Sequence, residues 1–388
     1  MRATGSSPRG EAADDPGAPL EQISFFDPYP HAFGGAQRVI EGLAAEIATR
    51  GLDVEVVTVG EGPLTDRLTS RGIPWRTVRL PKSLMVYGHQ TRGLRALSAI
   101  LSLPLTWFRV ARHLRRRSVA HVCDLRGMLL FAPAARLAGC RVVWHVNFPE
   151  RSRPLNRFAA ILASTIVAPS QDAKMRLAGV TPSRVEVIPN GIPPEPYEQK
   201  APEFQDPVIV TAARLTPEKG LDILIEALAR VLHLVPEARL LIQGSAQQGY
   251  ESYHRQLQKQ IAELGLGSAV SFLGFAEEPW REWRKACLYV QASREESFGL
   301  AAAEAMAAAL PVVATQVGAI RHMVVDGVTG LLVKPGDADE LAGAMVTLLL
   351  DRDLARGMGR AGRERVRQQL SFSIMGDRFL DLYRALVR

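Results

Sequence analysis

Residues 293–315 constrain the fold more than any other stretch, because an alanine-rich helical segment runs directly into an apolar segment. Residues 310–315 are rich in β-branched side chains, which is typical of a strand buried on both faces of a parallel sheet. A helix that leads into such a strand indicates a packed α/β domain. Ligands of these domains bind at the carboxyl ends of the strands, where such a helix begins.

Two glutamates flank the start of this helix: Glu296 lies just before it and Glu304 lies in its second turn. Unpaired backbone N–H groups at a helix start attract phosphate. Here they belong to Ser297, Phe298, Gly299 and Leu300. Carboxylates repel phosphate but accept hydrogen bonds from sugar or ribose hydroxyls. A solvated helix would explain a lone pair of glutamates, but the α/β context favours a sugar-nucleotide site.

A second charged site lies upstream, on the strand-to-helix loop at residues 214–220. Arg214 and Lys219 provide a guanidinium and an ammonium group on this one loop, which suits two adjacent phosphates. Solvated charges, or an ion pair between Lys219 and Glu218, would be the simpler explanation for the loop alone. The combination with the two glutamates favours a diphosphate.

His145 follows the apolar run 141–144 in the first half of the chain, so we expect it at the carboxyl edge of a sheet, facing a cleft. A hydrogen-bonded core histidine is the commoner explanation, but the strand-end position favours function. We interpret His121, inside a predicted strand, as structural and His31, in a loop, as acceptor-side.

Gly34 and Gly35 stand just before a predicted helix. Their lack of side chains would let the backbone approach a phosphate or a sugar. The G-x-G-x-x-G pattern of dinucleotide-binding folds is absent there. Gly244 and Ser245 form a second short loop, after the apolar run 240–243.

The alternation of strand-like and helical segments predicts a parallel sheet in each half of the chain. The 388 residues suit two domains, since one core rarely outgrows about 250–300 residues. We place a first domain at 21–196, ending in a proline-rich linker, and a second at 197–371. Residues 1–20 read as a disordered tail without the apolar core of a secretory signal.

The formal charge of +7 and the isoelectric point near 9.5 suggest an anionic partner: a nucleotide, a lipid headgroup or a nucleic acid. The three cysteines are too few and scattered for a disulfide framework or a zinc site, which suits a reducing compartment. Two Asp-x-Asp strings, at 337–339 and 351–353, fit a helix N-cap and a polar turn better than a metal site.

Four features, in order and at family spacing, resemble glycosyltransferase family 4. They are the Arg-x4-Lys loop, the Glu-x7-Glu element, the segment 326–330 and the glycine-rich segment 33–39. The resemblance covers nearly the whole chain after the first twenty residues. It implies the α/β GT-B fold, with two Rossmann-like domains facing across a cleft and residues 372–388 packing back on the first.

The resemblance also implies roles for single residues in a sugar transfer that retains the anomeric configuration. Arg214 and Lys219 would stabilise the departing diphosphate, so no metal is expected. Glu304 would hold the ribose hydroxyls, Glu296 the donor sugar, and His145 would approach the transferred sugar. Gly244, Ser245 and Phe275 would lie near the donor or at its base-binding edge.

The expected partners are a UDP- or GDP-sugar donor, with no nucleic acid, and a glycan, lipid-linked or small-molecule acceptor in the cytoplasm. Ala309, Ala319 and His322 depart from the family pattern. Ala309 replaces a usual glycine, and we expect it to be tolerated in the packing, whereas Ala319 and His322 leave the sugar open. Two alternatives remain: a phosphorylase or epimerase of the same fold, and an inactive sugar-nucleotide-binding scaffold, which the joint presence of the charged site residues disfavours.

Residues 94–117 combine leucines and aromatic side chains with clustered arginines, as an interfacial membrane helix does. The longest apolar stretch, 96–108, contains Pro104 and is too short to span a bilayer. We therefore expect either peripheral contact with an anionic membrane or an ordinary domain helix with a basic end, interrupted at Pro104.

Overall fold

The computed structural model describes residues 20, 22–29, 31, 33–81, 84, 94–114, 118–148, 152–198, 202, 204, 206–246, 249–276 and 278–388. The predicted disordered tail lies outside the described residues apart from its last position. Arg115, Arg116 and Arg117, at the end of the predicted membrane-binding segment, also lie outside them.

The first domain is built on a seven-stranded parallel sheet with the order β3-β2-β1-β4-β5-β6-β7. Its strands are β1 (Ile23–Asp27), β2 (Val54–Thr58), β3 (Trp75–Thr77), β4 (Val119–Cys123), β5 (Arg141–His145), β6 (Thr165–Ala168) and β7 (Val185–Val187). β1 and β4 are buried at every position, as expected for central strands covered on both faces.

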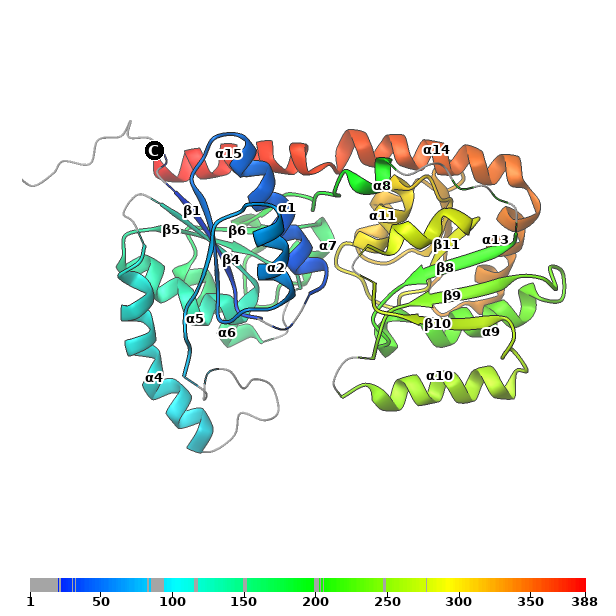
Figure 1. Cartoon of the computed structure of the whole chain (residues 1–388), viewed down its shortest axis with the longest axis horizontal. Helices are drawn as coiled ribbons and strands as arrows, with labels where there is room; N and C mark the ends of the chain where they lie inside the picture. Colours follow the sequence, from blue (N-terminus) through cyan, green and yellow to red (C-terminus); the bar gives the residue numbers. More distant parts are fainter. Residues whose placement is uncertain are drawn as a thin grey trace, which may run out of the picture.

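Helices cover both faces of this sheet (Figure 1). They are α1 (Gly35–Thr49), α2 (Pro63–Ser70), α4 (Leu94–Ala111), α5 (Asp124–Leu137), α6 (Arg153–Leu162), α7 (Gln171–Arg176) and the short η2 (Pro182–Arg184). One core packs α4, α5 and α6 against the sheet, and a second core packs α1 and α2 against its other face.

The second domain has a six-stranded parallel sheet with the order β10-β9-β8-β11-β12-β13. Its strands are β8 (Val208–Ala212), β9 (Arg239–Gln243), β10 (Val270–Gly274), β11 (Leu288–Gln291), β12 (Val312–Thr315) and β13 (Gly330–Val333). Its helices are α8 (Glu195–Glu198), η3 (Pro217–Lys219), α9 (Leu221–Val231), α10 (Glu251–Glu263), η4 (Pro279–Lys285), α11 (Leu300–Ala307), α12 (Ile320–Met323), α13 (Ala338–Leu350) and α14 (Arg352–Gln369). Two parallel-sheet α/β domains confirm the predicted fold class.

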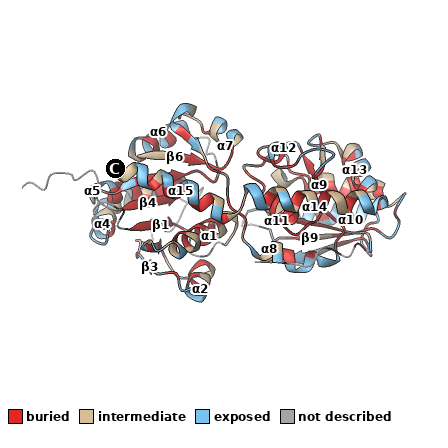
Figure 2. Cartoon of the chain, turned by 90° about the horizontal axis from the view of Figure 1, so that it is seen from above, coloured by how far each residue is buried: buried red, intermediate tan, exposed pale blue. Residues whose placement is uncertain are grey.

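The C-terminal helix α15 (Phe372–Val387) returns to the first domain and packs against α1 (Figures 1 and 2). The chain therefore passes between the domains twice, once near Ile192 and once near Leu370. The two crossings are joined, since the Ile192 N–H donates to the Leu370 carbonyl at 2.6 Å. This hydrogen bond ties together the two segments that cross between the domains.

One local expectation was wrong: Pro104 does not interrupt its helix, because α4 continues through it to Ala111. The strand β13 was not predicted, because the segment 326–330 was identified only by its resemblance to the family. Among the Asp-x-Asp strings, Asp337 does cap a helix, and its carboxylate accepts from the Glu340 N–H at 2.9 Å.

The backbone conformation of Ala309 explains why a glycine would suit this position. This residue adopts φ 60°, in the left-handed region that strains a residue with a Cβ. Its carbonyl also faces Gly359, where an added Cβ would lie 2.1 Å from that oxygen. The expectation of simple tolerated packing missed this backbone constraint.

Candidate active site between the two domains

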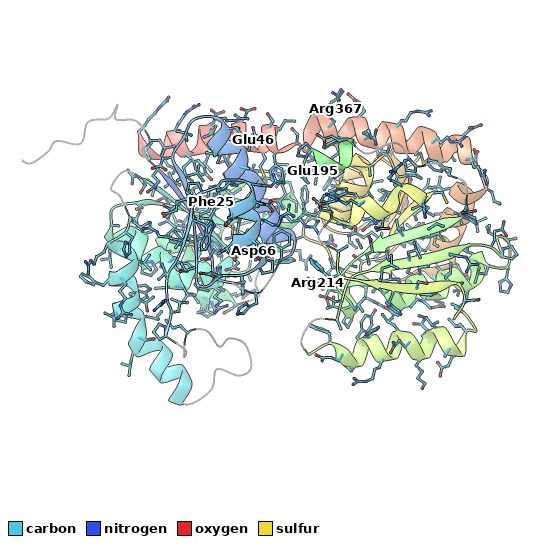
Figure 3. The ribbon with its side chains drawn as sticks, in the orientation of Figure 1. Phe25, Glu46, Asp66, Glu195, Arg214 and Arg367 are labelled. Carbon is cyan, nitrogen blue, oxygen red and sulfur yellow. The ribbon has the colours of Figure 1, made fainter. Side chains whose placement is uncertain are left out.

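The predicted donor-side residues of the second domain come together because they follow neighbouring strands. Arg214 and Lys219 follow β8, and Gly244 and Ser245 follow β9. Phe275 follows β10, and the segment with both glutamates follows β11. These four strands are adjacent in the sheet, so their carboxyl ends form one edge. Figure 3 shows Arg214 on the side of the second domain that faces the first.

Lys219 and Glu296 form the central ion pair of this edge. The Lys219 Nζ lies 2.7 Å from Glu296 Oε2, and the two side chains are 14% and 8% exposed. Glu296 also accepts from the Gln291 Nε2 at 2.7 Å. Lys219 therefore pairs with the predicted sugar-binding glutamate and not with Glu218. This pair holds a cation and a hydrogen-bond acceptor side by side.

Arg214 is more exposed than Lys219. Its guanidinium lies 3.8 Å from Glu218 and 5.4 Å from the ring centroid of Phe148, which follows β5 in the first domain. Arg214 therefore lies at the interface between the domains. An arginine in this position can reach a ligand bound at the edge of either sheet.

Glu304 is almost fully buried, and its partner comes from the first domain. Arg38 of α1 places its guanidinium 2.6 Å from the Glu304 carboxylate, and the same group lies 5.7 Å from the Trp280 ring centroid. Burial raises the pKa of Glu304 above its ordinary value, and Arg38 opposes that rise. Arg38 was not predicted as a site residue, although it lies inside the segment 33–39.

Close backbone approaches explain several of the glycines. A Cβ on Gly35 would lie 2.8 Å from a methyl group of Leu300, so the starts of α1 and α11 touch across the interface. Leu300 packs against the cores of both domains. A Cβ on Gly244, which has φ 148°, would lie 1.8 Å from the Ala213 carbonyl oxygen. The remaining glycine, Gly34, donates its N–H to the Gln37 Oε1 at 3.1 Å.

The segment before α11 is shaped by a left-handed residue. Gly299 has φ 93° and caps the helix, which begins at Leu300, so Ser297 and Phe298 precede it. Phe298 is buried, and the Ser297 carbonyl accepts from the Ser170 hydroxyl of the first domain at 2.8 Å. Further out, Ser245 and Phe275 are exposed at the strand edge.

His145 lies inside the first domain and is fully buried. Its Nδ1 is 3.1 Å from the Nε2 of His121, and His121 Nδ1 is 2.6 Å from the Tyr383 hydroxyl. Burial lowers the pKa of His145 to about 4, and the Asn190 side chain opposes this. The ring therefore lies at a strand end, as predicted, but it is enclosed and does not face an open cleft.

The carboxyl edge of the first sheet carries a second buried carboxyl, which the sequence did not single out. Asp27 ends β1 and is 2% exposed. Burial raises its pKa to about 7, the Gln37 amide opposes this, and the Asp124 carboxylate adds to it. Gln37 donates to Asp27 at 3.0 Å, which links this carboxyl to the glycine-rich loop. His31 is exposed nearby in sequence.

Only one group of three possible metal ligands occurs among the described residues: His121, Cys123 and His145, whose ligand atoms lie within 4.8 Å of one another. Two of the imidazole nitrogens already face each other at hydrogen-bond distance. Burial also raises the pKa of the Cys123 thiol well above its usual range, which disfavours the thiolate that binds metals. This group fits a hydrogen-bonded core better than a metal site.

The loop that departs from the family pattern also meets the first domain. Arg321 forms an ion pair with Asp172 of α7, and His322 Nε2 lies 3.7 Å from the same carboxylate. Arg176 pairs with Glu295 at 2.5 Å. Two cavities of about 380 and 340 Å³ lie elsewhere and are not lined by the predicted site residues. The ion pairs of Arg321 with Asp172 and of Arg176 with Glu295 therefore help to hold the facing edges of the two domains together.

Two Rossmann-like domains with parallel sheets, whose charged and glycine-rich strand ends meet at one interface, define the GT-B class of proteins. Comparison with known proteins agrees. The family model described as glycosyl transferases group 1 matches residues 195–365, and the one described as Glycosyltransferase Family 4 matches residues 33–196. The chain belongs to glycosyltransferase family 4.

Three similar proteins illustrate the family. A D-inositol 3-phosphate glycosyltransferase of Kribbella flavida is 35% identical over 205 residues, which are 48% of this chain and 48% of that protein. A GDP-mannose-dependent alpha-(1-6)-phosphatidylinositol monomannoside mannosyltransferase of Mycobacterium tuberculosis is 28% identical over 346 residues, or 81% and 85% of the two chains. Anabaena Alr3699/HepE, solved with UDP and glucose, is 25% identical with a TM-score of 0.78, covering 93% of this chain and 98% of that one. The chain spans about half the length of the first curated relatives that it matches.

Proposed function

We propose that this protein is a glycosyltransferase that moves a hexosyl group from a nucleoside diphosphate sugar to a hydroxyl acceptor and retains the anomeric configuration. The carrying observation is the Lys219–Glu296 ion pair beside Glu304, on the edge where β8 and β11 adjoin. It puts a cation for phosphate next to acceptors for sugar and ribose hydroxyls. Similar proteins are named for UDP, GDP-mannose and inositol phosphate, which supports a nucleotide-linked donor.

Donor binding would exchange partners at both glutamates. Lys219 would turn from Glu296 to the diphosphate, which leaves Glu296 to accept from sugar hydroxyls. Arg38 would release Glu304, which would then accept from the ribose. Preorganised cations aimed at developing charge are usually the largest electrostatic contribution to catalysis. Arg214 and Lys219 would supply it here as the diphosphate departs.

The same cations are the reason to propose catalysis without a divalent metal. Neither Asp-x-Asp string lies with these site residues, and both of their leading aspartates cap helices. Transfer measured after exhaustive chelation should match transfer with added magnesium or manganese. Activity that disappears on chelation and returns with either ion would contradict this part of the proposal.

Donor turnover tests the whole proposal. Purified protein is incubated with a panel of UDP- and GDP-linked hexoses, and release of the nucleoside diphosphate is measured together with the sugar product. Slow hydrolysis or transfer with retained configuration is expected for one donor. Conversion of the donor to an epimer would favour an epimerase, and phosphate-dependent cleavage of a glycan would favour a phosphorylase. Nucleotide binding without any turnover would favour an inactive scaffold.

For the acceptor we propose a lipid-linked or glycan molecule reached at the cytoplasmic face of an anionic membrane. α4 exposes Leu101, Leu105 and Phe108, which are 71%, 54% and 60% exposed on successive turns. Residues 92–170 contain thirteen arginines and only two acidic residues, so this segment is more basic than the whole chain, whose net charge is +7. No helix among the described residues is long and apolar enough to cross a bilayer. Apolar side chains beside basic ones suit an interfacial helix.

Liposome flotation tests this surface. Binding to anionic vesicles is expected to exceed binding to neutral ones and to fall when Leu101, Leu105 and Phe108 are all changed to serine. The matched control changes three exposed leucines of the second domain, Leu234, Leu264 and Leu350, to serine. Equal recovery with both vesicle types, or equal loss in the control, would contradict the membrane proposal.

A further inference from the structure

Two segments of the second domain lie side by side because they follow the adjoining strands β8 and β11 (Figure 1). Residues 214–222 are the β8 segment, and residues 292–296 are the β11 segment. The Lys219–Glu296 ion pair joins the two segments. The proposed donor binding opens this pair, so the two segments then need another link to keep their relative position.

A second ion pair joins the same two segments. The Arg294 guanidinium donates to both carboxylate oxygens of Asp222, at nitrogen–oxygen distances of 2.8 and 2.6 Å. The same guanidinium donates to the Pro217 carbonyl oxygen at 2.8 Å. A bidentate contact between a guanidinium and a carboxylate fixes the orientation of both groups as well as their distance. Arg294 therefore fastens the β11 segment to the β8 segment at two points.

The main chains of the two segments meet at the same place. The Arg294 N–H donates to the Glu218 carbonyl oxygen at 2.8 Å. Gly220 has φ 63°, and a Cβ added to it would lie 2.0 Å from the Ala292 carbonyl oxygen. The two segments therefore approach each other at backbone distance, and the protection of the Arg294 amide from hydrogen exchange reports whether they stay together.

Asp222 is held on its other side by α10. The Tyr253 hydroxyl donates to Asp222 Oδ1 at 2.7 Å, and the Gln260 amide donates to the Asp222 carbonyl oxygen at 2.9 Å. Burial would raise the pKa of Asp222, but hydrogen bonds from Arg294 and Tyr253 lower this pKa below its ordinary value. The pair is therefore charged at neutral pH. Neither of its side chains is among the proposed donor contacts, so the pair can stay closed when the donor binds.

We propose that Arg294 and Asp222 are positioning residues, whose ion pair keeps the β8 and β11 segments in register while the Lys219–Glu296 pair opens for the diphosphate. This role rests on the proposed function, but the fastening of the two segments does not. Without the pair, the groups that hold the diphosphate and the sugar would lose their preorganised geometry, on which electrostatic stabilisation depends.

The first experiment measures the fastening without any substrate. Amide hydrogen exchange at residue 294 is followed in the full-length wild type and in Arg294→Gln, and each rate is divided by the intrinsic rate for that sequence. Arg294→Gln should lower the protection of this amide by about tenfold, the value of one charge-assisted contact. Equal protection in the two proteins would overturn the proposal.

Arg230→Gln is the matched control in the same domain. Arg230 forms ion pairs with Glu226 and Asp339, and its side chain is 37% exposed against 39% for Arg294. Its loss should leave the protection of the amide at residue 294 and donor turnover unchanged. A loss of protection as large as that in Arg294→Gln would assign the effect to general destabilisation and overturn the proposal.

The second experiment measures the same pair in turnover. Arg294→Gln and Asp222→Asn should each lower kcat/KM for the donor by about three- to tenfold. The double variant should be no worse than the poorer single variant, because both changes break one contact. Arg294→Lys keeps the charge but not the bidentate geometry, so it should recover only part of the loss. Losses that multiply in the double variant would show that the two residues act separately and overturn the proposal.

The outcomes separate this proposal from the proposed function. Lower protection with normal turnover in Arg294→Gln would leave the pair a merely structural role and overturn the proposal. Lower protection in a protein that turns over no donor would support the fastening of the two segments and refute only the proposed function. If Asp222→Asn does not fold, Arg294→Gln and Arg294→Lys still decide.

Discussion

The facing edges of the two domains are both made of strand ends, but their polar groups are satisfied in different ways. In the second domain, Lys219 and Glu296 pair within one edge, and both come from adjoining strand-to-helix segments. In the first domain, His145 contacts His121, and His121 contacts Tyr383, which comes from the far end of the chain. The arrangement in the second domain is local to one sheet edge and therefore leaves a motif in the sequence. The arrangement in the first domain joins residues that are far apart in the chain and leaves no motif.

The comparison extends to the charges that join the domains. Glu304 belongs to the second domain, but its partner Arg38 belongs to the first. Ser170, Asp172 and Arg176 of the first domain also contact loops of the second. In this arrangement the first domain covers the donor edge, that is, the carboxyl ends of β8, β9, β10 and β11 where donor binding is proposed. Ligand binding at this edge must therefore compete with contacts between the domains.

The largest expected effect concerns the buried carboxyl of the first edge. The pKa of Asp27 is raised to about 7, so between about pH 4 and pH 7 the folded state holds a proton that the unfolded state releases. The free energy of unfolding should therefore fall as pH rises through this window. At about 1.4 kcal/mol per pH unit the loss approaches 4 kcal/mol at most. Denaturant titrations of the wild type and Asp27→Asn should show this slope only in the wild type. A wild-type slope that persists in Asp27→Asn would assign it to another group.

Next in size is the loss from the donor edge itself. Lys219→Ala and Glu304→Gln should each lower transfer by about ten- to a hundredfold, because charge-assisted contacts contribute about 1.5–3 kcal/mol. Initial rates at saturating acceptor measure this, and circular dichroism checks the fold. Lys259→Ala is the matched control, since Lys259 is an exposed lysine paired within α10. Normal turnover in both site variants would remove the site assignment.

A smaller effect is expected at the contact between the domains. Arg38→Met frees Glu304 for the ribose, so the Kd for the nucleoside diphosphate should fall by about tenfold, the value of one charge-assisted contact of about 1.4 kcal/mol. Small-angle scattering of the free protein should also show a larger radius of gyration. Arg50→Met, which removes an intradomain pairing with Glu46 and the contact to α15, is the comparison variant. Weaker nucleotide binding in Arg38→Met would show that Arg38 contacts the ligand directly.

The smallest expected effect concerns backbone strain at Ala309, which lies between α11 and β12. Ala309→Gly should raise the free energy of unfolding by up to about 1 kcal/mol, because glycine adopts φ 60° without a Cβ clash. Ala308→Gly, at the negative φ of −76°, should instead destabilise by a similar amount. Thermal unfolding of the two variants measures both signs. A lower melting temperature for Ala309→Gly would contradict the strain at this position.

These particulars show what the sequence could and could not predict. Buried β-branched runs and strand-end motifs predicted two parallel-sheet domains and grouped the residues that follow β8, β9, β10 and β11. The same reasoning could not foresee that Arg38 would occupy Glu304, because that pair joins residues 266 positions apart. The burial of His145 likewise depends on α15. Ala309 was misjudged because a single left-handed residue has no periodic signature.

The central claim is that nucleoside diphosphate binds at the charged strand ends of the second domain. A thermal-shift panel of nucleoside diphosphates and their sugars, run on the wild type and on the Lys219→Ala, Glu304→Gln double variant, tests it most directly. The account predicts that one nucleoside diphosphate raises the melting temperature of the wild type and leaves the double variant unchanged. An equal rise in both proteins, or no rise with any member of the panel, would contradict it.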